Sequence, residues 1–149
     1  MKETCKLDTD RAILAKWYSD TFGAAAPSAL QWKHLLDRPE DEPVTLVNFF
    51  KLRREAIYER ENGLSGQEAF DRYASVSMPT LAKVGGVFLM VAPFEASFIG
   101  EDEDWDIIAI GKYPNKQAVF DLFDDESYRV AYAHRVAACA KQRVMLVRN

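Results

Sequence analysis

Several short segments of this chain are apolar on both faces that a β-strand would present, and this feature limits its possible folds more than any other. Residues 44–50 (VTLVNFF) and 105–113 (WDIIAIGKY) are rich in β-branched and aromatic residues and too short for typical helices, which predicts two strands. A strand with one face in water alternates apolar and polar residues, but here neighbours such as Leu46 and Val47 are both apolar. Both faces of the predicted sheet must therefore be covered.

Two helices are predicted between the strands. Ser65 and Glu68 form a Ser-x-x-Glu capping box that begins the first helix, and Pro79 is expected to kink this helix or to end its first segment. Asn115 is expected to cap the second helix, and Asp124 to cap a further segment of it. Both helices carry an apolar stripe at helical spacing, so each can cover part of a sheet.

The order of these elements indicates the fold class. Two more strands are predicted at residues 87–92 and 143–147, which completes the order strand, helix, strand, strand, helix, strand. This is the order of the ferredoxin-like split βαβ motif, in which two crossover helices cover one face of an antiparallel sheet of four strands. We therefore expect an α+β protein whose second sheet face needs another cover.

A helical extension precedes the strands. Asp8 or Thr9 is expected to cap a first helix that ends at Gly23, and Pro27 suits the first turn of a second, shorter helix. Both helices carry aromatic stripes that neither can bury alone, so the hairpin is expected to dock onto the main domain or onto a second subunit.

A linker divides the chain into two parts. Residues 37–43 (DRPEDEP) are acidic and contain two prolines, so residues 1–42 are interpreted as a helical hairpin with its linker and residues 43–149 as the ferredoxin-like domain. The hairpin can cover part of the second sheet face, but a second subunit packing sheet against sheet covers more of it. We therefore expect a symmetric homodimer.

Composition and charge narrow the possible partners. The net charge is −4 and the basic residues are scattered, so no basic stripe is present to bind nucleic acid. The chain shows neither an apolar run of membrane-spanning length nor a signal peptide, so no membrane partner is expected and the cytoplasm is the expected compartment. Cys5 and Cys139 lack CxxC spacing and are interpreted as free thiols.

The sequence contains no pattern for a metal or a nucleotide. His34 and His134 are the only histidines, and the acidic residues lack the spacing of a calcium-binding loop. Neither a GxGxxG nor a GxxxxGK[ST] segment is present to hold a phosphate. We therefore expect no metal site and no cofactor.

Five segments, taken in order, carry a resemblance to a known family. They are VNFFKLR, SGQEAFDRYA, PTLAKVGG, WDIIAIGKYP and SYRVAYAHRVAA. From about residue 44 onward the chain resembles the DUF1330 family of dimeric α/β-barrel proteins. The family is similar to cofactor-independent monooxygenases and muconolactone isomerases, although its own name denotes a domain of unknown function. The resemblance implies a dimeric α/β barrel, and it does not include the helical extension.

Polar residues in the predicted first strand and last helix are candidates for a site. Asn48 is the only polar residue of its strand apart from Thr45, so it either points into a ligand cavity or is a satisfied structural amide. His134 is either a catalytic base, since it titrates near neutrality, or an ordinary helix residue.

Arg135 shares a helix face with Tyr128 by spacing. Its guanidinium can bind a ligand carboxylate bidentately. The alternative is a salt bridge to one of three acidic residues, Asp106, Asp121 or Asp125.

The segment after the first strand is also cationic. Lys51, Arg53 and Arg54 follow that strand and Tyr58 lies in the connection, so this loop can cover a pocket and offer cations to an anionic ligand. The alternative is a solvated basic turn.

The sequence favours a protein that binds a small, partly anionic organic molecule in the barrel cavity. The candidate catalytic residues are His134 and Asn48, and the candidate ligand-binding residues are Arg53, Tyr73, Trp105, Tyr128 and Arg135. The resemblance implies a monooxygenase- or isomerase-like enzyme, and the alternative is a non-catalytic dimeric binding or assembly module. A further alternative is a haem-binding or haem-degrading barrel, because Asn48, Trp105 and His134 resemble the Asn, Trp and His set of such barrels in element order.

Overall fold

The computed structural model describes residues 2–148, with side chains described from residue 8 onward, so the side chain of Cys5 lies outside the described residues. None of the helices in this part of the chain is both long and apolar enough to cross a membrane. The elements, in chain order, are α1 (Lys2–Phe22), the 3-10 turn η1 (Gly23–Ala25), α2 (Ala29–Leu36), β1 (Val44–Leu52), α3 (Gly66–Lys83), β2 (Val87–Pro93), β3 (Ile107–Tyr113), α4 (Lys116–Asp124), α5 (Glu126–Ala138) and β4 (Cys139–Val147).

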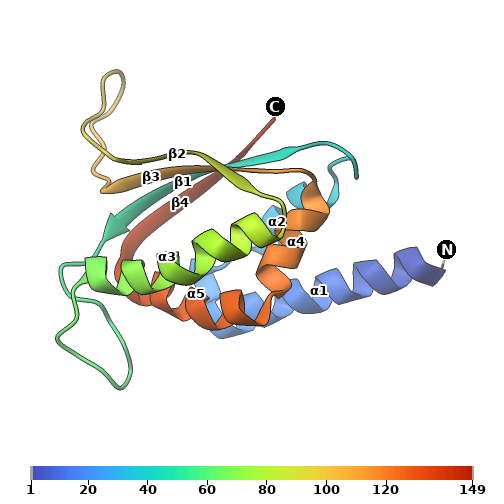
Figure 1. Cartoon of the computed structure of the whole chain (residues 1–149), viewed down its shortest axis with the longest axis horizontal. Coiled ribbons are helices and arrows are strands. Elements are labelled where there is room, and N and C mark those ends of the chain that lie inside the picture. The colour runs from blue at the N-terminus through green and yellow to red at the C-terminus, as the bar shows by residue number, and fades with distance from the viewer. Residues whose placement is uncertain (1, 149) are drawn as a thin grey trace.

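The strands form one antiparallel sheet in the order β2-β3-β1-β4. In the middle of the sheet Phe50 of β1 lies opposite Ile107 of β3 and Gln142 of β4. Helices α3 and α5 pack side by side across one face, and none of the described helices lies over the opposite face (Figure 1). This arrangement confirms the predicted α+β class and the ferredoxin-like order.

In the main domain the helix ends follow the predicted caps with one exception. Ser65 and Glu68 form the expected capping box on α3, and Asn115 caps α4. The cap of α5 is Asp125 rather than Asp124, because the Asp125 carboxylate accepts the N–H of Tyr128. Pro79 does not end a first segment of α3, because the helix runs on to Lys83 and carries buried residues on both sides of the proline. That Pro79 kinks the helix stays a prediction.

The helices of the N-terminal extension begin at other residues than expected. Helix α1 already begins at Lys2, ahead of Asp8 and Thr9. Helix α2 begins after Ser28, whose hydroxyl forms a capping box with Gln31, so Pro27 lies before the helix. A Ser-x-x-Gln box satisfies two backbone N–H groups at once, so a helix that begins after Ser28 is more stable than one that begins at Pro27.

The strands also differ from their expected lengths. Strands β1 and β2 extend slightly beyond the predicted ends, and β4 begins at Cys139 because the chain passes directly from α5 into it. Strand β3 begins at Ile107, so Trp105 lies before the strand.

The N-terminal hairpin packs against α4 and α5, on the helical side of the molecule. Tyr18 is fully buried, and its hydroxyl donates to the carbonyl of Phe123 at 2.6 Å. Trp32 stacks on Phe120 with ring centroids 5.5 Å apart. In return Tyr132 of α5 donates its hydroxyl to the carbonyl of Ala25. The hairpin thus docks on the main domain beside α4 and α5 (Figure 1). The expectation that it can cover part of the second sheet face is wrong, because its aromatic stripe packs against an aromatic surface on α4 and α5.

The open face of the sheet is apolar. By strand alternation it carries Val47, Phe49, Ile108 and Ile110 in the two central strands. The edge strands add Val87, Met90 and Met145, which are 55 %, 43 % and 43 % exposed. Loop 94–106, which joins β2 to β3, projects beyond the end of the sheet where β2 ends and β3 begins (Figure 1). Its residues Phe98 and Ile99 are 97 % and 89 % exposed.

Candidate functional site

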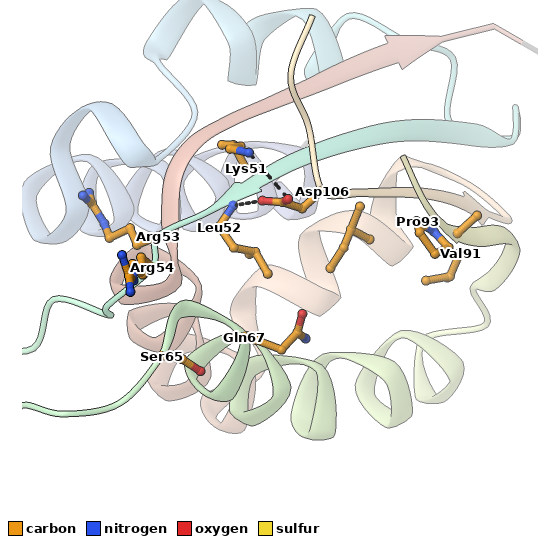
Figure 2. Close-up of a pocket in the computed structure, with 11 residues that line it drawn as sticks. Lys51, Leu52, Arg53, Arg54, Ser65, Gln67, Val91, Pro93 and Asp106 are labelled. Atoms are coloured by element: carbon orange, nitrogen blue, oxygen red, sulfur yellow. Dashed lines mark hydrogen bonds and ion pairs between the residues drawn. The ribbon is translucent and has the colours of Figure 1, made fainter. Parts of the chain in front are cut away.

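A cleft of about 820 Å³ opens where β1 ends, between the edge of the sheet and the first turn of α3 (Figure 2). Its volume lies in the range of small-molecule sites, which is roughly 300–1,000 Å³. The apolar wall comes from the sheet, and the polar and charged groups come from the end of β1, the residue before β3 and the start of α3. The lining residues are Lys51, Leu52, Arg53, Arg54, Ser65, Gln67, Val91, Ala92, Pro93, Asp106 and Ile107.

Backbone contacts set the shape of this cleft. The N–H of Leu52 donates to the Asp106 carboxylate at 2.7 Å, which ties the end of β1 to the start of β3. On the other side, a Cβ atom on Gly66 would lie 2.0 Å from the carbonyl oxygen of Arg53, so only glycine allows this approach of α3 to β1. The amide of Gln67, one residue further along, points from α3 toward Leu52 (Figure 2).

The cations of the cleft differ in their partners. Lys51 lies 3.0 Å from Asp104 and 3.6 Å from Asp106, and its hydrogen bond to Asp104 raises the pKa of the Lys51 ammonium. Arg53 and Arg54 make neither an ion pair nor a side-chain hydrogen bond with any residue from 8 to 148, and the Nε atom of Arg53 is enclosed without a partner. Two guanidinium groups beside the cleft are therefore free to bind an anion.

A second group of predicted residues comes together in the core, beneath the sheet. Arg135 is 5 % exposed, and it donates from Nε to Gln142 at 2.7 Å and from Nη1 to the Tyr73 hydroxyl at 3.1 Å. The Tyr73 and Tyr128 hydroxyls are 2.8 Å apart. The guanidinium also lies 4.8 Å from the centre of the Phe50 ring. Tyr73, Tyr128 and Arg135 thus form one buried cluster, separate from the lining of the cleft.

The salt bridge that was the alternative for Arg135 is absent from the described part of the chain. Asp106 is bonded to Leu52 and Lys51, Asp121 to Gln117, and Asp125 to Lys83 and the start of α5. Aromatic rings and neutral hydrogen-bond acceptors surround Arg135 in place of a carboxylate. Burial raises the pKa of the Tyr128 hydroxyl well above its usual value, so this neighbour stays neutral.

The other three predicted residues lie apart from one another. Asn48 shares the helix-facing side of β1 with Phe50, and its amide donates to the Ala109 carbonyl at 3.0 Å. Trp105 lies on the opposite, open side, 5.6 Å from Phe49 and 4.6 Å from the Lys141 ammonium. The structure therefore does not bring Asn48 and Trp105 to one pocket, as a haem site built on them would require.

His134 lies on α5, beside the loop that follows β1. Its Nδ1 atom is 2.7 Å from the Tyr58 hydroxyl. Burial, followed by the nearby positive charge of Arg72, lowers the pKa of the His134 imidazole. Arg72 is itself held by a two-pronged ion pair with Glu61. His134 thus anchors the loop and is not among the residues that line the cleft.

Among the described residues, neither the Cys139 thiol nor a group of metal ligands adds a reactive group to the cleft lining. Cys139 is a buried free thiol, and burial raises its pKa to about 11, so it stays protonated at neutral pH. Within the residues that the structure describes, no three His, Cys, Asp or Glu side chains are grouped to hold a metal ion.

Sequence reasoning identified one part of the cleft and missed another. Arg53 was a candidate ligand-binding residue and does line the cleft, with Lys51 and Arg54 of the same segment. The opposite walls, including Gln67 and Val91, were not candidates. The capping box at the start of α3 is a signal that could have located Gln67, because in a split βαβ motif this helix begins near the end of the first strand.

Solved structures share this fold. RPA0582, a protein of unknown function from Rhodopseudomonas palustris, is 29 % identical, with a TM-score of 0.77 over 84 % of this chain and 95 % of that one. Its methylated form is 28 % identical, with a TM-score of 0.78 over 86 % of this chain and 96 % of that one. A dimeric protein of unknown function with a ferredoxin-like fold from Bacteroides fragilis is more distant, at 14 % identity and a TM-score of 0.49 over 74 % and 100 % of the two chains.

Family membership agrees with the resemblance seen in the sequence. No curated protein matches the chain. The model of the domain of unknown function DUF1330 matches residues 61–149, which include α3, α4, α5 and the last three strands. The match begins after β1, so Lys51, Arg53 and Arg54 lie outside it. This chain therefore belongs to the DUF1330 family.

Proposed function

We propose that this protein binds a small organic anion in the cleft at the end of β1. The observation that carries the proposal is the pair of guanidinium groups, Arg53 and Arg54, that border the cleft. Neither guanidinium is paired with a carboxylate of the described residues. The sheet side offers Leu52, Val91 and Ile107 to an apolar body. An apolar pocket with a few placed polar groups is the usual form of a small-molecule site.

The arrangement favours binding over acid–base catalysis. Lys51 and Asp106 are the cleft's other ionisable groups, and they are paired with each other. His134, the candidate base, is bonded to Tyr58 outside the cleft lining. A general base must lie within hydrogen-bond reach of the proton that it removes. We therefore favour a binding protein over a monooxygenase- or isomerase-like enzyme.

Titration with benzoate, followed by the backbone amide resonances of the protein, tests this proposal. Benzoate combines one carboxylate with an apolar ring, and we expect shifts concentrated at Leu52, Gln67 and Ile107. The double variant Arg53→Met/Arg54→Met should weaken binding about tenfold or more, because it removes both charge-assisted hydrogen-bond donors. Arg60→Met is the matched control, since Arg60 lies in the same loop, is exposed, and is not part of the cleft lining. Shifts scattered over the surface, or unchanged affinity in the double variant, would contradict the proposal.

We also propose that the protein is a homodimer joined through the open sheet faces. The open face carries Val47, Phe49, Ile108 and Ile110 in its centre, and an apolar sheet face of this kind needs a cover. The ends of the face differ in charge, because at the loop end Lys51 and Arg143 are paired with Asp104 and Glu103, which leaves acidic residues in excess. The loop tip carries Glu101 and Asp102, while Lys112 lies at the far end.

A two-fold axis running across the strands would place the acidic end of one copy against the basic end of the other. Light scattering at micromolar concentration should therefore give the mass of two chains. A mass of one chain would contradict the dimer and leave the cleft proposal intact.

A further inference from the structure

The two unpaired cations of the cleft lie at the same end of it. Arg53 and Arg54 lie at the end of the cleft nearer Ser65 and the start of α3, whereas Val91 and Pro93 lie at the other end (Figure 2). The cleft is therefore polarised, with positive charge at one end and apolar surface at the other.

Neither positive charge is compensated within the described part of the chain. Asp106 is the one carboxylate of the lining, and it is occupied by Lys51 and by the N–H of Leu52. Arg53 is half-buried and has no carboxylate partner among the described residues, so an incoming anion would supply a countercharge to its guanidinium. Two neighbouring like charges also repel one another, and the repulsion remains until both are neutralised.

The position of these arginines is fixed by the backbone. Gly66 approaches the Arg53 carbonyl so closely that no side chain would fit, and the N–H of Gly66 contacts the Arg54 carbonyl at 3.4 Å. The N–H of Arg53 is bonded to the Ala138 carbonyl at 2.8 Å. Both guanidinium groups thus project from a segment held on two sides, which favours recognition of a fixed arrangement of charges.

We infer that the ligand carries a compact head with two negative charges on an apolar body. A single carboxylate can pair with one guanidinium in the bidentate manner and leaves the second uncompensated. A head with two charges, either two adjacent carboxylates or one phosphate monoester, engages both arginines at once. The apolar body then lies toward Leu52, Ile107 and Val91, within reach of the Gln67 amide. This inference rests on the proposed function, because it specifies the ligand of the same cleft.

Calorimetric titration of the full chain with benzoate, phthalate and phenyl phosphate tests the inference. All three probes share one aromatic ring, and they differ in head charge. We expect phthalate or phenyl phosphate to bind about tenfold more tightly than benzoate, since a further charge-assisted hydrogen bond contributes about this factor. The tighter of the two identifies the head as a dicarboxylate or a phosphate monoester.

Single variants locate the second charge. In Arg53→Met and in Arg54→Met the advantage of the dianion over benzoate should fall to about twofold or less, whereas Arg60→Met should keep it. The second ionisation of a phosphate monoester occurs near pH 6, so phenyl phosphate should lose its advantage between about pH 7.5 and 5.

Three outcomes decide between the two proposals. A tighter dianion whose advantage is lost in both single variants supports the inference. Equal affinity for benzoate and the dianions overturns it and leaves the proposed function standing. Absence of binding by all three probes at millimolar concentration overturns the inference and the proposed function together.

Discussion

The helix-covered face of the sheet and its open face are built from similar residues but have different surroundings. On the covered face the side chains of β1 pack into the core, and even a guanidinium, Arg135, is enclosed there by tyrosines and Gln142. On the open face none of the helices and strands of residues 2–148 lies over Val47 and Ile110. The difference teaches that apolar residues on both sides of a strand predict that both faces of the sheet are to be covered. The described helices of this chain cover one of the two faces.

The largest expected effect is on the open face. Ile110→Asp should raise the dimer dissociation constant about 1,000-fold, equivalent to about 4 kcal/mol, because the two-fold axis buries the new carboxylate twice. Sedimentation velocity would detect the monomer. Met78→Asp is the control, since Met78 lies exposed on α3, and this variant should remain dimeric. A dimeric Ile110→Asp protein would show that the two faces do not differ as described.

The covered face can be probed at Arg135. Arg135→Ala should lower the free energy of unfolding by about 3 kcal/mol, because it opens a cavity among aromatic rings and leaves Tyr73 and Gln142 without a partner. Urea denaturation at constant protomer concentration measures the loss. Arg53→Ala, at the rim of the cleft, should change stability by no more than about 0.5 kcal/mol. Equal losses in the two variants would remove the distinction between a structural and a ligand-facing arginine.

The docking of the hairpin on the covered side gives a smaller effect. Tyr18→Phe removes one buried hydroxyl that donates to the Phe123 carbonyl and should cost about 1 kcal/mol of unfolding free energy. Thermal or urea unfolding would record it. Tyr58→Phe is the comparison variant. Because Tyr58 is only half-buried, this substitution should lower the free energy of unfolding by less. No loss in Tyr18→Phe would mean that the hairpin is not held as the structure shows.

The smallest effect concerns His134, which holds the loop to α5. Its pKa in the folded protein lies below the unfolded value of about 6.5, so the folded state binds fewer protons than the unfolded chain in this range. Stability should therefore fall as the pH drops from about 7 through the folded pKa, and the loss should be complete below it. Unfolding curves of the wild type and His134→Gln between about pH 7.5 and 5 should diverge in this direction. Parallel curves would contradict the shift.

The sequence was sufficient for the fold because the relevant signals are local. The apolar run of β1 and the capping box at Ser65 each depend on neighbouring residues, and their order admits few topologies. The docking site of the hairpin was not predictable in the same way. An aromatic stripe such as that of Tyr18 must be buried, but burial of apolar area is non-directional and does not specify the partner surface.

The candidate site was predicted only in part for a related reason. Arg53 lies in a cationic run that is visible in the sequence, whereas the cleft is completed by Gln67 and Val91 from elements far along the chain. For Arg135 the helical spacing correctly placed Tyr128 on the same face, but the two alternatives drawn from the chemistry of arginine both gave it a carboxylate partner. Spacing shows which residues share one helix face, and it does not show that β4 brings Gln142 to the guanidinium.

The reciprocal tyrosine bonds of the hairpin bear on how this molecule can be dissected. Tyr18 caps a carbonyl at the end of α4, and Tyr132 caps one in the turn that joins the first two helices. If the chain is cut at the linker, the hydroxyl of Tyr18 in one fragment and that of Tyr132 in the other lose their acceptors. Phe120 and Phe123 also become exposed. A truncated protein that begins after the linker would thus expose an apolar aromatic surface that the hairpin covers in the intact chain, and it would tend to aggregate instead of reporting on the cleft.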